Sequence, residues 1–446
     1  MSFALFTAYI LCTYLRPVEL FAPELGAYRP MLWLWAAAFV AALARAAVRR
    51  EFGARWLHMG LLGAFVLMIA VSQVANQWVG GATDAILEFS TSAMLMLLCF
   101  LNLTTTRRLQ ITCAVVAACV VVLAAIGTYS FHTGFMAQEL VLRQNTADEE
   151  ARDSGDVAEI PAHDTSSKYI LRVRSLGFLN DPNDFAQAMI MVMPILFLGY
   201  AKRTWLARLA FVGAPTALLG YAIFLTQSRG ALFGLASLAL FPLHRLLGTL
   251  RTSALLVALA VVAVGASFGG REISSNESSA AQRINAWSDG LNMLKFKPLF
   301  GVGYGNFVDH HEITAHNSFV LCFAELGLLG YFVWLAMIVV AYKGLEQVLS
   351  RGPPERLERR LALSLRASLV GFLVCSWFLS RTYQPGLYIL LALCIAAWYC
   401  DQGFAAKSSS DAAAQDLPSW RKSTVLAMTA SIATVYMFVL SHNLGR

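Results

Sequence analysis

Long apolar runs alternate with short polar connections along almost the whole chain, and this pattern predicts the architecture. A helix needs about 20 apolar residues to cross the hydrocarbon core of a bilayer, and about twelve or thirteen runs approach that length. We therefore predict an all-α polytopic integral membrane bundle that occupies residues 1–446 as a single transmembrane domain. The predicted spans are residues 3–15, 31–48, 59–77, 85–103, 111–131, 185–200, 206–226, 231–243, 253–268, 318–342, 367–380, 385–400 and 425–440.

The composition supports a membrane protein. Hydrophobic residues make up 58% of the chain and charged residues 14%, which is too apolar for a soluble globular protein. The net charge of +7 is explained by connections that face anionic lipid headgroups, so we expect a lipid bilayer and no nucleic acid as partner. All eight cysteines lie in or beside apolar runs, which predicts neither a disulfide framework nor a cysteine metal site. Residues 3–15 lack a basic start and a small-residue cleavage site, so we expect them to be a retained span.

Lysines and arginines predict the orientation, because positive charge near span ends is kept in the cytoplasm. With the N-terminus inside, the inner connections carry most of these residues, including the cluster at residues 351–366. Two long connections, residues 131–184 and 269–317, then lie outside, where we expect short amphipathic helices. Residues 401–423 form a cytoplasmic linker before an additional C-terminal span.

The first long outer loop changes character along its length. Its middle, residues 145–168, is rich in acidic side chains, and we expect a mobile, solvated insertion in preference to a lid over a substrate. We expect His132 and His163 to be solvated residues of this loop. The alternation of apolar residues that follows predicts an ordered surface segment that projects Arg172 and Arg174 in one direction.

An Asn-Asp-Pro-Asn turn, residues 180–183, separates this segment from the next span. Pro182 suits a first helical position, and we expect Asn183 or Asp184 to act as the helix N-cap first and as a ligand second. Asn180 and Asn183 are therefore secondary site candidates. A glycosidase-like pair of Asp181 and Asp184 is the alternative, although both fit capping chemistry better.

The second long outer loop begins with an amphipathic pattern. Residues 282–296 repeat apolar side chains at helical spacing beside Arg283 and Lys295, which predicts an interfacial helix that ends at Pro298. Gly301, Gly303 and Gly305 then permit tight turns or the close approach of a bulky ligand. The glycines do not indicate a nucleotide site, because no strand precedes them.

His316 ends this loop at the point where the next span begins. Histidine is the side chain whose unperturbed pKa, about 6.5, allows proton exchange near neutral pH, so His316 is the candidate general base and Asn317 a secondary candidate. Glu325, nine residues later, points to nearly the opposite side of an ideal helix. Gly327 and Gly330 suggest close helix packing. The acidic and histidine residues 309–312 are a weaker metal-site alternative, and we expect no metal.

Arginines gather on the same predicted side. Arg229 lies between two apolar runs, where a guanidinium group needs an anionic partner unless it snorkels to the interface, and Arg381 repeats the situation. Because guanidinium groups match phosphate oxygens, this combination fits a phosphorylated lipid as leaving group and a hydroxyl group as nucleophile. His316 would then accept the proton of the hydroxyl group.

Five motifs in this order resemble the bacterial O-antigen ligase and O-antigen polymerase superfamily. They are Gly-Phe-Leu-Asn-Asp-Pro-Asn at residues 177–183, Ser-Arg-Gly-Ala at 228–231, Arg283 before Trp287, Pro-Leu-Phe-Gly-Val-Gly at 298–303, and His-Asn-Ser-Phe at 316–319 with Glu-Leu-Gly-Leu-Leu-Gly at 325–330. The resemblance covers residues 171–342. The acidic insertion and the thirteenth span depart from a twelve-span ligase.

The resemblance implies a metal-independent inverting glycosyltransferase of the GT-C type, without a cofactor, in the bacterial inner membrane. It implies a donor glycan linked to undecaprenyl pyrophosphate, a site that faces the periplasm, pyrophosphate binding by Arg174, Arg229 and Arg283, and acceptor activation by His316. Arg172 and Arg381 are secondary candidates. We favour a ligase, whose acceptor is lipid A-core, because one long loop carries His316 directly before a span; an O-antigen or exopolysaccharide polymerase, whose acceptor is a glycan, is the alternative, and a protein is a further candidate acceptor.

Two other classes remain open beside the transferase. A lipid-linked sugar flippase or transporter would also be an apolar bundle, but it would carry charges along a path inside its spans. In this chain the main candidates for such charges are Glu88 and Glu325. A non-catalytic assembly component is the other alternative.

Overall fold

A computed structural model describes residues 1–49, 56–145, 169–199, 204–240, 278–351, 353–408 and 419–444. Within these residues, eight helices are long and apolar enough to cross a membrane. The predicted all-α, polytopic membrane architecture is therefore confirmed. The predicted span at residues 253–268 and residues 146–168 of the acidic insertion lie outside the described residues.

The eight candidate membrane helices coincide with predicted spans. They cover Pro30–Val48, Leu57–Ala75, Val79–Asn102, Thr106–Thr133, Trp205–Leu225, Ser318–Ser350, Pro385–Gln402 and Trp420–His442. Ser2–Leu15 and Arg229–Leu240 are shorter apolar helices at two further predicted spans. The last of the eight occupies the additional C-terminal span.

The chain forms two compact units. Unit 1 comprises Met1–Ala41, Gln110–Ile273 and Val370–Cys375, and unit 2 comprises Ala42–Leu109, Ser274–Leu369 and Ser376–Arg446. Three helices contribute residues to both units: α3 (Pro30–Arg49), α6 (Thr106–Thr133) and α15 (Leu357–Ser376).

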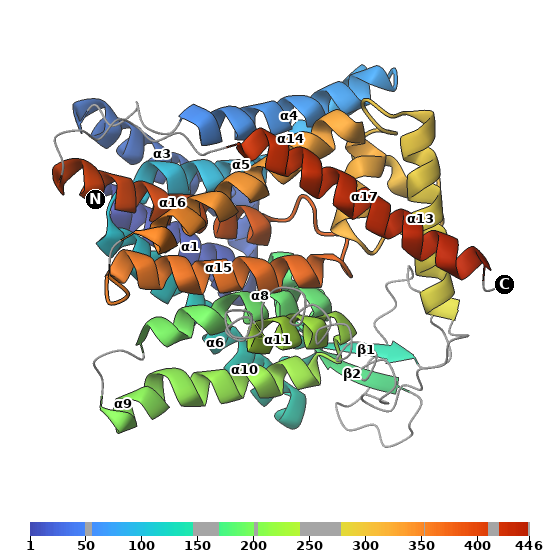
Figure 1. Cartoon of the computed structure of the whole chain (residues 1–446). Helices are drawn as coiled ribbons and strands as arrows, with labels where there is room; N and C mark the ends of the chain where they lie inside the picture. Colours follow the sequence, from blue (N-terminus) through green and yellow to red (C-terminus); the bar gives the residue numbers. More distant parts are fainter. Residues whose placement is uncertain are drawn as a thin grey trace. The chain divides into compact units, whose positions relative to one another are not determined.

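The described residues of unit 1 are helical apart from one pair of strands (Figure 1). Its other elements are α1 (Ser2–Leu15), α2 (Pro17–Phe21), η1 (Pro23–Tyr28), α7 (Ala137–Leu140), β1 (Val141–Asn145), β2 (Tyr169–Val173), η3 (Gly177–Leu179), α8 (Pro182–Leu196), η4 (Phe197–Gly199), α9 (Trp205–Arg208), η5 (Leu209–Gly213), α10 (Ala214–Leu225) and α11 (Arg229–Leu240).

The strand pair is an element that the sequence pattern did not predict. β1 and β2 are antiparallel, with Val141 opposite Val173 and Arg143 opposite Leu171. Both valines are buried, so the apolar side chains at this end of the ladder face the interior of unit 1. The predicted ordered segment thus forms strand β2. Strand β1, at the other end of the same loop, pairs with β2 and stabilises it.

Helix α8 lies at the centre of unit 1 and packs against α10 and α11. It begins with Pro182 at a first-turn position, as predicted, but its N-cap is Asp181, whose carboxylate accepts the Asn183 amide hydrogen at 2.7 Å. The prediction of Asn183 or Asp184 as the cap is wrong. Asp181 already has the extended backbone of an N-cap residue (φ −85°, ψ 135°), and this leaves the Asn183 side chain for another contact.

Unit 2 is organised around the 33-residue helix α14 (Ser318–Ser350), which packs against its neighbours along its length (Figure 1). These neighbours are α4 (Trp56–Ala75), α13 (Ser278–Phe296), α16 (Pro385–Ser408) and α17 (Trp420–Leu444), and α5 (Val79–Asn102) packs in turn against α4 and α16. A short helix, η6 (Asn306–Asp309), lies in the loop between α13 and α14.

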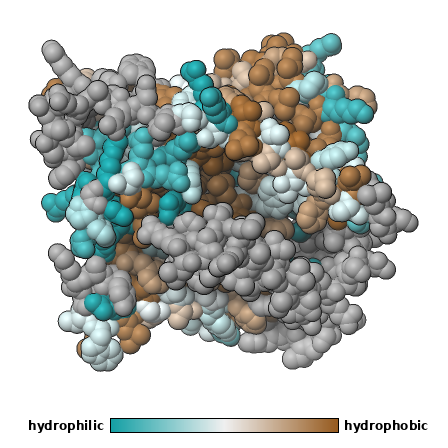
Figure 2. Space-filling view, in the orientation of Figure 1, coloured by the Kyte–Doolittle hydropathy of each residue, from teal (hydrophilic) through white to brown (hydrophobic). Residues whose placement is uncertain are grey.

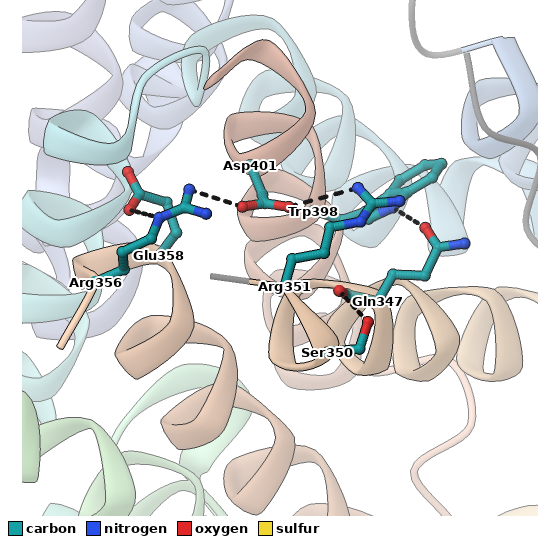
Figure 3. Close-up of polar contacts among 7 residues, drawn as sticks. All are labelled: Gln347, Ser350, Arg351, Arg356, Glu358, Trp398 and Asp401. Atoms are coloured by element: carbon teal, nitrogen blue, oxygen red, sulfur yellow. Dashed lines mark hydrogen bonds and ion pairs between the residues drawn. The ribbon is translucent and has the colours of Figure 1, made fainter. Parts of the chain in front are cut away.

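The C-terminal end of α14 carries an ion-pair cluster (Figure 3). The Asp401 carboxylate on α16, 1% exposed, accepts a hydrogen bond from Arg356 Nη2 at 2.9 Å and lies 3.6 Å from Arg351 Nη1. Arg356 Nε lies 3.6 Å from Glu358, which also accepts the Thr106 hydroxyl hydrogen at 2.9 Å. One buried carboxylate therefore ties the end of α14 to the start of α15.

Apolar side chains cover much of the molecular surface, as a bilayer requires. Figure 2 shows a broad apolar area in the region of α4 and α17. Leu67, Val74, Leu426, Met437 and Phe438 are among the exposed residues of these two helices. Contiguous exposed apolar surface of this kind indicates contact with lipid.

Candidate active site

His316 lies directly before the N-terminus of α14, in an unusual backbone conformation. Its φ angle is +46°, a left-handed value that few non-glycine residues adopt. The next residue, Asn317, is the N-cap, and its Oδ1 accepts the amide hydrogens of Phe319 at 2.9 Å and Val320 at 3.2 Å. Backbone strain of this kind persists only where the surrounding structure enforces it.

Three contacts hold the segment around His316. The Trp287 indole on α13 donates a hydrogen bond to the Ala315 carbonyl at 2.9 Å, and the Thr314 hydroxyl donates to Ser380 Oγ at 2.9 Å. On the other side, Ser318 Oγ accepts the Arg381 amide hydrogen at 2.9 Å. His316 is therefore positioned between α13 and the turn that connects α15 with α16.

The two polar atoms of the Asn317 side chain differ in their hydrogen bonding. Its side-chain oxygen caps α14, whereas its Nδ2 donor is buried and has no hydrogen-bond partner among the described residues. A buried amide group without a partner costs about 1–3 kcal/mol. An oxygen atom of a bound substrate or a water molecule would remove this cost beside His316.

Helix α14 is interrupted at Gly327, and the loop that contains Gly301, Gly303 and Gly305 packs against the interruption. Gly327 has φ +63° and ψ −170°, and the Leu328 amide donates to the Pro298 carbonyl at 2.8 Å. The amides of Val302 and Gly303 donate to the carbonyls of Ala324 and Glu325 at 2.9 and 3.0 Å. The loop thus satisfies backbone groups that the break exposes, as non-helical backbone at membrane depth requires.

Two glycines permit this close contact of backbones. A Cβ atom on Gly301 would lie 2.3 Å from the Glu325 carbonyl carbon, and one on Gly327 would lie 2.4 Å from the Leu299 carbonyl carbon. The prediction that Gly327 serves helix packing is therefore wrong, because the residue approaches the loop and not another helix. The neighbour that approaches Gly301 closely is the backbone of α14, whereas the predicted approach of a bulky ligand stays a prediction.

Glu325 also lies at this break and is 2% exposed. Its Oε2 accepts the Tyr383 hydroxyl hydrogen at 2.7 Å, and its Oε1 accepts the Phe307 amide hydrogen at 3.3 Å. Burial and the neighbouring carboxylate raise the pKa of Tyr383 well above its usual range, so its hydroxyl group stays protonated and donates. The Tyr304 ring lies 4.4 Å from the Tyr383 ring, centroid to centroid.

Arg283 occupies α13 one turn before Trp287. Because residues four apart lie on the same face of a helix, Arg283 shares the face whose indole holds Ala315, the residue before His316. The helix predicted at residues 282–296 is observed as α13, which begins earlier, at Ser278, and ends at Phe296; its position at a membrane interface stays a prediction. Arg283, Arg381, Asn317 and His316 therefore belong to one neighbourhood of unit 2.

The other histidines of the loop have separate partners. His311 Nδ1 lies 2.8 Å from Asp289 Oδ2 on α13, and His310 Nδ1 lies 3.0 Å from the Asn306 carbonyl. Within the described residues, no three histidine, cysteine or acidic side chains converge as a metal site would require.

Unit 1 contains the remaining predicted residues. The Arg172 guanidinium group is 5% exposed and donates through Nε to the Thr226 carbonyl at 2.8 Å and through Nη2 to Asn183 Oδ1 at 3.0 Å. Arg172 thus links β2, the end of α10 and the first turn of α8. Asn180, in contrast, is exposed.

Arg174 contacts a different part of unit 1. Its Nε donates to the Glu139 carbonyl at 3.0 Å and its Nη2 to the Gln138 carbonyl at 2.8 Å, next to α7. Burial lowers the pKa of Arg174, while Glu139 and Asp181 partly offset the effect. The two arginines therefore contact different partners, although they leave the same extended segment.

Arg229 is the first residue of α11 and follows the end of α10 by a tight turn at Gln227, whose φ is +52°. A guanidinium group at this position adds its charge to the positive end of the helix dipole. Both favour an anion at the start of α11. Ser228, the residue before it, is buried.

The structure thus distributes the predicted site over two groups of residues. His316, Asn317, Arg283 and Arg381 lie in unit 2, and Arg172, Arg174, Asn180, Asn183 and Arg229 lie in unit 1. The sequence did not indicate the roles of Tyr383 and Trp287. A signal was present for Glu325, which is an acidic residue inside an apolar run two positions before a glycine.

Comparison with known proteins supports the recognition of the family. No curated protein matches the chain. Residues 214–335 match the model of the O-antigen ligase family, and this segment includes Arg229, Arg283, His316 and Glu325. This match supports the predicted resemblance to the O-antigen ligase and O-antigen polymerase superfamily, and the eight long apolar helices of the described residues are those of a multi-pass membrane protein.

Proposed function

We propose that the protein is a metal-independent inverting glycosyltransferase of the bacterial inner membrane. It transfers a glycan from undecaprenyl pyrophosphate to an acceptor hydroxyl group at the periplasmic face. The observation that carries the proposal is the position of His316, which is held in a left-handed conformation directly before α14 and lies within the O-antigen ligase segment.

In this mechanism, His316 accepts the proton of the acceptor hydroxyl group. The acceptor oxygen attacks the anomeric carbon of the donor sugar from the face opposite the pyrophosphate, and the bond from this carbon to the phosphate oxygen breaks. Undecaprenyl pyrophosphate leaves with the bonding electron pair, and the configuration at the anomeric carbon inverts. A positioned general base of this kind contributes about 10²- to 10⁴-fold to the rate.

Arginines stabilise the negative charge that develops on the departing pyrophosphate. Arg229 adds its charge to a helix N-terminus, and Arg283 lies one turn from the residue that anchors the His316 segment. Arg174 has two N–H groups on backbone carbonyls, and an anion would offset the burial of its charge. Arg172 has its contacts inside unit 1 and serves mainly to hold the strand, while Arg381 is a secondary ligand.

The test uses a His316→Asn variant, because asparagine tolerates a left-handed backbone but provides no base at neutral pH. Purified protein receives donor and acceptor in the presence of a chelator. We expect turnover to fall by about 10²- to 10⁴-fold while donor binding and thermal unfolding stay at wild-type values. Full activity of this variant would exclude the proposed mechanism.

His311→Asn is the matched control, because His311 lies five residues away in the same loop and pairs with Asp289 on α13. We expect this variant to retain turnover within a few-fold. The products then separate the members of the superfamily, since a ligase joins glycan to lipid A-core whereas a polymerase lengthens the lipid-linked glycan. Movement of the donor across a vesicle membrane without transfer would indicate the transporter alternative.

A further inference from the structure

Glu325 is a buried carboxylate in unit 2 that the proposed chemistry does not use. Within the described residues it forms no ion pair, and its two oxygens accept hydrogen bonds from neutral donors. A buried carboxylate in an apolar helix is costly, and such residues usually have a functional reason. The two donors indicate what that reason is.

The donors lie on the two segments that carry His316 and Arg381. Phe307, which binds Oε1, belongs to η6 in the loop that leads to His316. Tyr383, which binds Oε2, lies two residues after Arg381. One carboxylate therefore joins two segments that are distant from each other in the sequence.

We propose that Glu325 is a positioning residue, which fixes the His316 loop relative to the Arg381 turn through the Phe307 amide and the Tyr383 hydroxyl group. The inference rests on the proposed function. Neither contact places Glu325 on a substrate, and its effect on transfer passes through the residues that it holds.

Further contacts keep both partners in place, so that Glu325 joins segments that are already ordered. The Tyr304 carbonyl accepts a hydrogen bond from Gln73 at 2.6 Å, and the Tyr304 amide donates to Ser72 Oγ at 3.1 Å. The Tyr383 carbonyl accepts the Ser92 hydroxyl hydrogen at 2.7 Å. α4 and α5 thus hold the backbones near the two donors, and Glu325 sets the distance between them.

The link uses both oxygens of the carboxylate as acceptors. A carboxylate accepts at both oxygens, whereas the amide of a glutamine accepts at one atom and donates at the other. In Glu325→Gln, the amide oxygen can accept only from the Phe307 N–H, and the amide nitrogen then donates to the Tyr383 hydroxyl oxygen, so a weaker neutral hydrogen bond of reversed direction replaces the charge-assisted one at nearly constant volume. Tyr383→Phe removes this half of the link and leaves the Phe307 contact in place.

The experiment measures turnover, donor KM and thermal unfolding of the full-length protein with a lipid-linked glycan donor. We expect Glu325→Gln and Tyr383→Phe each to lower kcat by about 10- to 100-fold, because small displacements of catalytic groups cost this much. We expect the donor KM to change by less than about two-fold, since the arginines remain. The double variant should be no worse than the poorer single variant, because both changes break one link.

Three outcomes decide between the interpretations. Wild-type kcat in Glu325→Gln and Tyr383→Phe, with an inactive His316→Asn variant, overturns the positioning role and leaves the proposed function intact. A loss of stability with unchanged kcat in the folded fraction also overturns it, since Glu325 is then structural only. Activity of His316→Asn at the wild-type level instead refutes the proposed function. If Glu325→Gln does not fold, Tyr383→Phe decides alone.

Discussion

A buried carboxylate lies near each end of α14, and the two carboxylates have different kinds of partner. At the C-terminal end, Asp401 is compensated by the guanidinium groups of Arg351 and Arg356 (Figure 3). Near the N-terminal end, Glu325 accepts hydrogen bonds from a phenol and a backbone amide, without an ion pair among the described residues. The first arrangement cancels charge, and the second fixes the geometry of two segments.

The backbone conformation of α14 also differs between its two ends. The C-terminal half of α14 is regular, whereas the N-terminal part is preceded by a strained His316 and interrupted at Gly327. Strain and irregular backbone in proteins concentrate at functional sites. We therefore expect a structural role for the Asp401 cluster and a functional role for the N-terminal end of α14, and three substitutions can break this division.

The largest effect is expected from Gly327→Ala. An alanine here needs φ +63°, and its Cβ would lie 2.4 Å from the Leu299 backbone, which cannot move without breaking the contacts between loop and helix. We expect a loss of more than about 4 kcal/mol of stability, visible as failure to fold or a large drop in the unfolding temperature. Gly344→Ala is the control, since its Cβ would have side-chain atoms of Trp398 as its nearest neighbours, the first at 3.0 Å, and no positive φ is needed. Equal effects of both substitutions would contradict the comparison.

The second effect is expected from Asp401→Asn at the opposite end. The substitution removes the negative charge from a cluster whose arginine side chains are 28% and 19% exposed, so water compensates them in part. We expect a loss of about 1–3 kcal/mol of stability, below the value for a fully buried ion pair. The kcat of the folded protein should remain within about two-fold, which a detergent-purified sample with a measured folded fraction can show. A selective loss of kcat would place the Asp401 cluster in the transfer mechanism.

Hydropathy predicted the helices well because a membrane span depends on the local sequence alone. The additional span at residues 425–440 appears as α17, and the helix predicted at residues 282–296 as α13. The start of α14 after His316 was also predictable, because Asn317 and Ser318 are good residues for a helix N-terminus. These features need no knowledge of distant contacts.

Features that depend on distant partners were not predictable in the same way. The break at Gly327 is stabilised by a loop about 25 residues earlier, Tyr383 binds Glu325 across 58 residues, and β1 pairs with β2 across the acidic insertion. Hydrophobic periodicity contains no information on such pairs. The glycines at 301 and 327 and the acidic residue at 325 were visible in the sequence, but only the folded chain brings them into contact.

The smallest effect on stability is expected from the substitution of two tryptophans that make similar hydrogen bonds at the two ends of α14. The Trp287 indole donates to the Ala315 carbonyl at 2.9 Å near His316, and the Trp398 indole donates to Gln347 Oε1 at 2.8 Å near the Asp401 cluster. Both side chains are about equally buried, so Trp287→Phe and Trp398→Phe should each cost about 1 kcal/mol of stability for the lost hydrogen bond.

The two variants should differ only in turnover. Without its indole hydrogen bond, the segment before His316 loosens, and we expect kcat of Trp287→Phe to fall by about 10-fold. Trp398→Phe should keep the wild-type kcat, because its contact holds the end of α14 that has no part in transfer. Parallel measurements of thermal unfolding and single-turnover transfer distinguish the two responses. A matching loss of kcat in both variants would mean that the whole of α14 supports the site, and the division into a structural end and a functional end would fail.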